Sequence, residues 1–206
     1  SHGVTLREGV GLERLLGDER VTGARLTNGE EIEADFVVVG VGIEPATILA
    51  ASAGLTIDNG IATDIHCQTS DPHIWAAGDC ASCLFEGNRI RLESVGNAID
   101  MAEVAALNMM GQDVEYAPKP WFWSDQYDCK LQIAGLNTGY DAIHVRKGEA
   151  GARSHWYYRE GRLIAVDAMN DSRAYMVGKR LIESGKSPAP EAVIDPATEL
   201  KALLKA

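Results

Sequence analysis

The chain carries the stretch HIWAAGDCA at residues 73–81. Its small and apolar residues predict a strand over 73–79 that is buried on both faces of a sheet. The strand would end in Gly78 and Asp79, and ligands of open α/β sheets bind at the carboxyl ends of the strands. Gly78 would let a ligand approach the backbone, and Asp79 can accept hydrogen bonds from sugar or polyol hydroxyls. A Gly-Asp pair alone is more often an ordinary turn, so its neighbours in the sequence matter.

A second feature is the stretch RLESVGNA at residues 91–98, which runs into a helix predicted over 94–110. The N–H groups and the positive dipole end at a helix N-terminus stabilise an anion, including negative charge that develops on a ring oxygen during reduction. The alternative is that Ser94 simply caps the helix. The predicted apolar face consists of Val95, Ala98, Ile99, Ala102, Ala105, Ala106 and Met109.

The sequence before residue 46 predicts an antiparallel meander followed by one buried strand. Short apolar segments at 4–7, 21–26 and 31–34 alternate with polar turns. The pair Asn28-Gly29 is a strong hairpin signal, because both positions of the favoured turn need positive φ. Residues 35–42, DFVVVGVG, are β-branched without alternation, which is typical of a strand buried on both faces of a sheet.

The rest of the chain predicts an α/β segment, a linker and an α+β segment. Helices are expected at 46–54, 172–184 and 196–206. The two prolines within 112–120 indicate a linker. Strands are expected at 55–57, 61–65, 131–135, 142–147, 154–159 and 163–169.

Composition and charge bound the class of protein. The 206 residues are 46% hydrophobic and 24% charged, as in an ordinary globular protein. The net charge of −11 argues against nucleic acid as a partner, because that affinity comes mostly from cationic side chains. Residues 143–186 nevertheless hold nine basic and five acidic residues, so they are the place to attract an acidic partner, unless they form only a solvated face.

The cysteines and the apolar runs indicate a cytoplasmic protein without a membrane span. The four cysteines are Cys67, Cys80, Cys83 and Cys129, and we expect them to be reduced. The CxxC spacing of 80–83 follows the Gly-Asp strand and opens no thioredoxin-like helix, so we expect no dithiol role. A zinc site that uses His66 or His73 would lack a second close pair of ligands. We therefore expect no metal ligand and no catalytic residue in this chain.

Four motifs resemble the carboxyl-terminal half of FAD-dependent pyridine nucleotide-disulfide oxidoreductases. They are VVVGVGIEP at 37–45, IWAAGDCA at 74–81, ESVGNA at 93–98 and PWFWSDQY at 120–127. The Gly-Asp motif is shared by the broad superfamily. The last two motifs resemble the ferredoxin reductase branch, the putidaredoxin- and rhodocoxin-reductase-like proteins that serve oxygenase systems. The resemblance covers nearly the whole chain.

The resemblance implies an α/β fold that is part of the two-dinucleotide-domain flavoprotein architecture. Residues 1–43 would be the end of the NAD-binding domain, 44–112 the returning part of the FAD-binding domain, and 113–206 the α+β C-terminal interface domain. The family binds each pyrophosphate at a Gly-x-Gly-x-x-Gly loop, and we find neither loop here. Pro45 stands where the third glycine of 40–45 would be. We therefore expect a parent reductase about twice as long.

The same resemblance implies FAD and NAD as cofactors. Asp79 would hydrogen-bond the ribityl chain of the flavin, and Gly78 would leave room for it. The backbone of Val95, after Glu93 and Ser94, would face the pyrimidine end of the flavin ring.

Three aromatic residues and one departure complete the implied site. Trp123 would lie near the flavin and the nicotinamide, with Trp121 and Phe122 as neighbours. The alternative for Trp121 and Phe122 is a place in the core of the second domain. Ala46 stands where many relatives have Asn, so the contribution of that amide is in doubt.

The implied function is NADH-dependent reduction of a small [2Fe–2S] ferredoxin through FAD, by the parent protein and not by this chain alone. Alternatives are a rubredoxin, nitrite or disulfide-type reductase, or a non-enzymatic dimerisation or docking module. The choice between NADH and NADPH and a homodimeric state stay open. An acidic ferredoxin would be drawn to the basic region between Arg146 and Lys186, through Arg146, Lys147, Arg153, Arg159, Arg173, Lys179 and Arg180.

Overall fold

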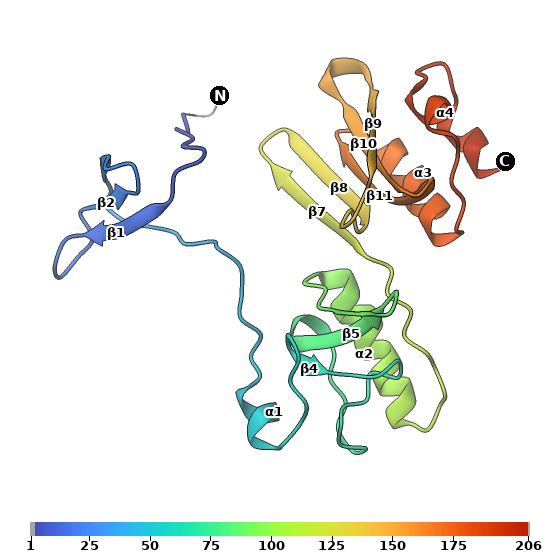
Figure 1. The fold of residues 1–206 in the computed structure, drawn as a ribbon, viewed down its shortest axis with the longest axis horizontal. Helices are drawn as coiled ribbons and strands as arrows, with labels where there is room; N and C mark the ends of the chain where they lie inside the picture. Colours follow the sequence, from blue (N-terminus) through green and yellow to red (C-terminus); the bar gives the residue numbers. More distant parts are fainter. Residues whose placement is uncertain (1–2, 206) are drawn as a thin grey trace. The chain divides into compact units, whose positions relative to one another are not determined.

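The computed structural model describes residues 3–205. They fall into two compact units, which divide between Glu44 and Pro45 (Figure 1). Within the described residues, no helix is both long and apolar enough to cross a membrane.

The first unit contains a three-stranded antiparallel sheet of order β1-β2-β3. The strands are β1 (Leu12–Leu16), β2 (Gly23–Leu26) and β3 (Glu31–Glu33). The predicted hairpin is confirmed, because the N–H of Leu26 donates to the carbonyl of Glu30 and Gly29 has a φ of +87°. The strand expected at 4–7 is wrong. Thr27 bonds Gly11 through both its backbone and its hydroxyl, and this places the strand that pairs with β2 further along the chain.

The buried strand predicted at 35–42 is also absent from the described part of this unit. Phe36 is 76% exposed and Val38 is 84% exposed. A β-strand exists only where neighbouring strands accept and donate its backbone hydrogen bonds. None of the strands described within 3–205 pairs with these residues, so the apolar run stays extended and exposed.

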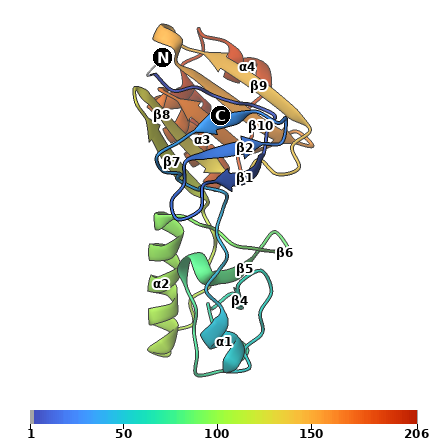
Figure 2. The ribbon, with the colours of Figure 1, turned by 90° about the vertical axis from the view of Figure 1, so that its left-hand side faces the viewer.

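The first part of the second unit places a small mixed sheet beside one long helix (Figure 2). The strands β4 (Ile61–Ala62), β5 (Ala81–Phe85) and β6 (Asn88–Ile90) have the order β4-β5-β6, and β4 runs parallel to β5. The helices are α1 (Ile48–Ser52), the 3₁₀ turn η1 (Gly78–Cys80) and α2 (Val95–Met109), so the helices predicted at 46–54 and 94–110 are confirmed.

The strand expected at 73–79 is wrong. Trp75 forms only an isolated bridge with Gln68, and residues 78–80 form the turn η1. The regular strand here is β5, which begins directly after that turn. The piece expected at 55–57 is likewise reduced to one bridge between Ile57 and Ile61.

The buried face of α2 differs from the predicted apolar face. Asn97, Met101 and Ala105 are buried, whereas Val95 is 59% exposed and Ile99 is 54% exposed. Asn97, Met101 and Ala105 follow an i, i+4, i+8 row, and Gly96 is buried beside it. Ala105 is the one residue of the predicted apolar face that α2 buries, because the buried row begins at the polar residue Asn97 and lies to one side of the predicted face.

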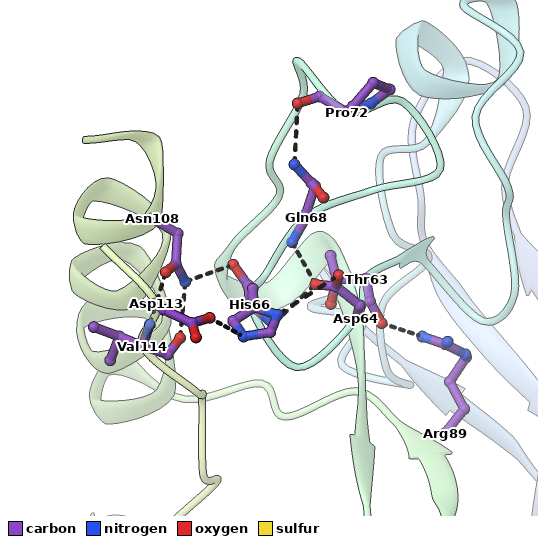
Figure 3. A network of polar contacts seen from close by, with 9 residues as sticks. All are labelled: Thr63, Asp64, His66, Gln68, Pro72, Arg89, Asn108, Asp113 and Val114. Atoms are coloured by element: carbon purple, nitrogen blue, oxygen red, sulfur yellow. Dashed lines mark hydrogen bonds and ion pairs between the residues drawn. The ribbon is translucent and has the colours of Figure 1, made fainter. Parts of the chain in front are cut away.

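A polar network fastens the loop before β5 to the C-terminal end of α2 (Figure 3). The side-chain amide of Asn108 donates to the carbonyl oxygens of His66 at 3.0 Å and Val114 at 2.8 Å. The Nε2 atom of His66 lies 3.0 Å from a carboxylate oxygen of Asp113. The carboxylate of Asp64 accepts the backbone N–H of His66 at 2.8 Å. These contacts hold the loop that leads to Gly78 against the helix.

The second part of this unit is a five-stranded antiparallel sheet of order β7-β8-β11-β10-β9. Its strands are β7 (Trp121–Gln126), β8 (Cys129–Gly135), β9 (Ala142–Lys147), β10 (Arg153–Arg159) and β11 (Arg162–Met169). The four strands expected between 131 and 169 are confirmed. The sequence analysis predicts no strand at β7, whose residues it quotes only as part of the motif at 120–127.

One face of the five-stranded sheet is covered by helix α3 (Ser172–Glu183), which confirms the helix expected at 172–184. Asp171 caps α3 by accepting the backbone N–H of Ala174. The core beneath it includes Trp156, Val166 and Leu181, all fully buried. The terminal helix expected at 196–206 is shorter than predicted. It is the 3₁₀ helix η3 (Leu200–Leu204), preceded by α4 (Pro190–Ile194), which the sequence did not predict; η2 (Glu149–Gly151) joins β9 to β10.

Candidate functional site

The Gly-Asp turn lies against the first turn of α2. Gly78 is buried with a φ of +78°, a conformation that favours glycine. A Cβ atom at Gly78 would lie 3.4 Å from the Cβ atom of Ala98. The two motifs that the sequence analysis treated separately are therefore neighbours in the fold.

The side chain of Arg91 connects the two motifs. Its Nη1 atom donates to the backbone carbonyl of Asp79 at 3.0 Å and lies 2.6 Å from the carboxylate of Glu93. The Arg91 side chain is only 10% exposed, and its Cδ atom packs against Gly60. Because Arg91 bonds the backbone of Asp79, the exposed carboxylate of that residue is left for another partner. The sequence analysis missed Arg91, since an arginine between two apolar residues gives no signal of where it reaches.

Ser94 caps α2, and the helix N-terminus is left with free donors. The Ser94 hydroxyl accepts the N–H of Asn97 at 3.2 Å, and its carbonyl accepts the N–H of Ala98 at 3.0 Å. The N–H groups of Val95 and Gly96 precede the first intrahelical backbone donor, the N–H of Ala98, and carry the positive end of the helix dipole. We call the following residues the α2 junction: Gly78, Asp79, Arg91, Glu93, Ser94 and Val95.

Asn97 is a buried polar residue whose hydrogen bonds are satisfied. Its side-chain amide donates to the carbonyl of Leu92 at 3.0 Å, and its oxygen accepts a hydrogen bond from the hydroxyl of Tyr116. Burial raises the pKa of Tyr116 above its usual range, so its hydroxyl stays a donor. These bonds hold the first turn of α2 onto the polypeptide on both sides of the helix.

The aromatic strand β7 contacts the first turn of α2 through Trp121. A Cβ atom at Gly96 would overlap the indole ring of Trp121, so glycine is required for this contact. The rings of Trp121 and Trp123 are stacked with centroids 5.4 Å apart. Trp123 is 39% exposed and Phe122 is 45% exposed, so neither ring belongs to the core. The ammonium of Lys179 lies 5.1 Å from the centre of the Trp121 ring.

Two of the four cysteines lie in an environment that suppresses thiol chemistry. Cys67 and Cys83 are buried, and burial raises the pKa of Cys67 to about 12 and also raises the pKa of Cys83. A protonated thiol is a poor nucleophile. All four cysteines are free in the part of the chain that is described. Among residues 3–205, no group of three His, Cys, Asp or Glu side chains is placed to hold a metal ion.

The basic region does not act as a single exposed face. Arg146 donates to the carbonyls of Val193 at 2.9 Å and Asp195 at 2.7 Å, and it also bonds the backbone at 196 and 198. It therefore fastens the C-terminal segment, and its expected role in docking stays a prediction. Arg159 lies 2.7 Å from the carboxylate of Glu86. Lys147, Arg153, Arg173 and Arg180 remain exposed.

Comparison with known proteins now places the chain. Residues 1–102 match the model of the pyridine nucleotide-disulphide oxidoreductases, and residues 121–204 match the reductase C-terminal domain. The chain belongs to this oxidoreductase family. The resemblance noted from the sequence motifs is thereby confirmed.

The similar proteins belong to the ferredoxin reductase branch. The chain is 40% identical to the 5,5'-dehydrodivanillate O-demethylase ferredoxin reductase subunit of a Sphingobium species, over 100% of this chain and 52% of that protein. It is 37% identical to putidaredoxin reductase of Pseudomonas putida, over 99% of this chain and 50% of that protein. The chain thus spans about half the length of the curated relatives it matches.

Solved structures agree with this placement. A ferredoxin reductase from Rhodopseudomonas palustris superposes with a TM-score of 0.89 at 40% identity, over 94% of this chain and 49% of that chain. The putidaredoxin reductase in its covalent complex with putidaredoxin gives a TM-score of 0.86 at 36% identity, over 93% of this chain and 48% of that chain. The mixed α/β fold expected for this reductase-family chain is therefore confirmed.

Proposed function

We propose that this chain is the carboxyl-terminal portion of an NAD(P)H-dependent, FAD-containing ferredoxin reductase that serves an oxygenase system. One observation carries the proposal: Arg91 and the Gly78–Ala98 contact bring an exposed carboxylate and the open N-terminus of α2 together. The family membership of the chain supplies the chemistry to which this arrangement is assigned. The proposed domains are the end of an NAD-binding domain at 1–43, part of an FAD-binding domain at 44–112 and an interface domain at 113–206.

The α2 junction fits the polar parts of a flavin. The carboxylate of Asp79 would accept hydrogen bonds from ribityl hydroxyls, and Gly78 keeps the turn beside it free of a side chain. The N–H groups of Val95 and Gly96 would face the pyrimidine end of the ring, where the helix dipole stabilises negative charge. FAD, when bound, supplies the conversion of a hydride's electron pair into single-electron transfers.

The remaining junction residues position these groups. Glu93 neutralises Arg91 and so fixes the guanidinium on the backbone of Asp79. Ser94 is the N-cap residue at which α2 begins, so the N–H of Val95 has no acceptor within the helix. Trp123 would offer an exposed aromatic face near the flavin and the nicotinamide. Trp121 would anchor it, because Trp121 stacks on Trp123 and also packs against Gly96 of α2.

The proposed electron acceptor is an acidic [2Fe–2S] ferredoxin. The exposed cations that would steer it are Lys147, Arg153, Arg173 and Arg180, since Arg146 is committed to the C-terminal segment. A related reductase has been captured in a complex with its partner putidaredoxin, which supports a protein acceptor of this kind. Steering between opposite charges weakens as the salt concentration rises.

The disulfide-type alternative is disfavoured by the thiols themselves. Cys83 is buried within β5, and burial raises its pKa, so Cys83 is a poor partner for a reactive dithiol at 80–83.

The test is an acceptor assay of the full-length holoenzyme that contains these residues. With NADH as donor, the proposal predicts rapid reduction of a [2Fe–2S] ferredoxin that slows as salt is added. Rubredoxin and a small disulfide should be reduced far more slowly. Faster reduction of rubredoxin or of the disulfide would overturn the proposal and favour another reductase. A full-length protein that retains no flavin would overturn it in favour of a docking module.

A further inference from the structure

The second unit contains a cavity whose lining is separate from the residues of the α2 junction. Its volume is about 570 Å³, and it is formed by the β5–β6 hairpin, residues 117–120, and parts of β8, β11 and α3. This volume is typical of small-molecule sites, which run from about 300 to 1,000 Å³. Among the described residues that line the cavity, none belongs to the α2 junction. The flavin proposal therefore leaves this cavity unexplained.

The cavity has an apolar wall. Most of its lining surface is apolar, with Phe85 and Ile90 on the hairpin side and Leu136, Ile164 and Ile182 on the sheet and helix side. Burial of an aromatic ring against such a wall is favoured by the hydrophobic effect. A strongly hydrated ligand such as a sugar would bind poorly there, because taking its hydroxyl groups out of water costs free energy that an apolar wall does not return.

The rim of the cavity is positively charged in an acidic protein. Four basic side chains and two acidic ones line the cavity, although the whole chain has a net charge of −11. Two guanidinium groups share one carboxylate, because Arg159 lies 2.7 Å and Arg162 3.1 Å from oxygens of Glu86. Lys179 lies 3.9 Å from Glu183. One of the two guanidinium charges is thus not neutralised by Glu86.

We propose that this cavity binds a small aromatic carboxylate, with its ring on the apolar wall and its carboxylate on Arg159 and Arg162. Guanidinium groups recognise carboxylates through paired N–H donors, and this geometry suits a planar anion. The guanidinium charge that Glu86 leaves uncompensated is matched by one carboxylate. Glu86 is an internal carboxylate on the same two guanidinium groups, so it competes with the ligand.

Because Glu86 would compete with the ligand, the proposal can be tested by titration calorimetry of the full-length holoenzyme with 2-naphthoate. The proposal predicts saturable binding, and neutral 2-naphthalenemethanol should bind at least about tenfold more weakly, because a hydrogen bond to a charged group is lost. The Arg162→Gln variant should bind 2-naphthoate about tenfold more weakly for the same reason. The Glu86→Gln variant should bind it several-fold more tightly.

These variants distinguish binding from folding. Arg162→Gln and Glu86→Gln each remove the ion pair between Glu86 and Arg162. If this ion pair only held the β5–β6 hairpin in place, both variants would bind 2-naphthoate more weakly. The proposal instead predicts opposite effects. The control is Arg153→Gln, an exposed arginine outside the cavity lining, which should leave the affinity unchanged. No saturable binding, equal binding of the neutral alcohol, or unchanged or weakened binding by Glu86→Gln would overturn the proposal.

Discussion

Two arginine–carboxylate contacts of the second unit differ in burial and therefore in what they can do. At the α2 junction, the Arg91 side chain is 10% exposed and bonds both a backbone carbonyl and the carboxylate of Glu93. At the cavity rim, Arg162 is 59% exposed and shares Glu86 with Arg159. A buried pair is costly to disturb once formed, whereas exposed pairs contribute little and exchange partners easily. The first contact suits a rigid site, and the second suits one that opens to a competing anion.

The largest expected effect is at the glycine that joins α2 to β7. In a helix, Gly→Ala normally stabilises by up to about 1 kcal/mol. Gly96→Ala should instead lower the free energy of unfolding by about 2 kcal/mol, because the new Cβ atom overlaps the indole of Trp121. Urea unfolding followed by tryptophan fluorescence measures this. The control Ala102→Val, on the exposed side of the same helix, should cost less than about 0.7 kcal/mol. Stabilisation by Gly96→Ala would show that the helix does not pack on Trp121.

The next effect is at the buried arginine. Arg91→Met keeps an unbranched side chain against Gly60 but removes the hydrogen bond to Asp79 and the partner of Glu93. We expect the free energy of unfolding to fall by about 2 kcal/mol. Arg180→Met, at an exposed position of α3, is the matched control and should change it by less than about 0.5 kcal/mol. Equal effects of the two substitutions would contradict the assignment of Arg91 to a rigid junction.

The smallest effect is the pH dependence of the rim. The hydrogen bond from Arg159, aided by the charge of Arg162, holds the pKa of Glu86 below its ordinary value of 4.5. The stabilisation is therefore present above that ordinary value and is lost as pH falls through the lower folded-state pKa. Glu86 is largely solvated, so the contribution should be under about 1 kcal/mol. The difference in unfolding free energy between the wild type and Glu86→Gln should shrink between neutral pH and about pH 3. A difference that grows on acidification would contradict this assignment.

The strands that could be predicted from the sequence are those that find their partners nearby in the chain. The run 162–169 pairs with β10 across a short turn, and its residues are buried beneath α3. The run 36–41 is equally apolar but has no partner strand among the residues described, and it is exposed. An apolar run therefore shows that a segment can form a strand, but the strand forms only where a neighbouring strand is present to pair with it.

The candidate site divides in the same way. The Ser94 cap could be predicted because cap chemistry is local, whereas the predicted strand ending at Gly78 and Asp79 is a turn. Arg91 and the contact between Gly96 and Trp121 could not be predicted, because each depends on segments brought together by the fold. Asn97 was missed because it is a polar residue on a buried helix face, satisfied by Leu92 and Tyr116.

The most direct test of the α2 junction as a flavin site is the FAD affinity of the full-length holoenzyme with Asp79→Ala. Its control is Asp100→Ala, an exposed carboxylate on α2 outside the junction. Loss of a hydrogen-bonding carboxylate should weaken FAD binding about tenfold or more for Asp79→Ala, with no change for Asp100→Ala. Wild-type FAD affinity in a correctly folded Asp79→Ala protein would contradict the assignment of the α2 junction to the flavin.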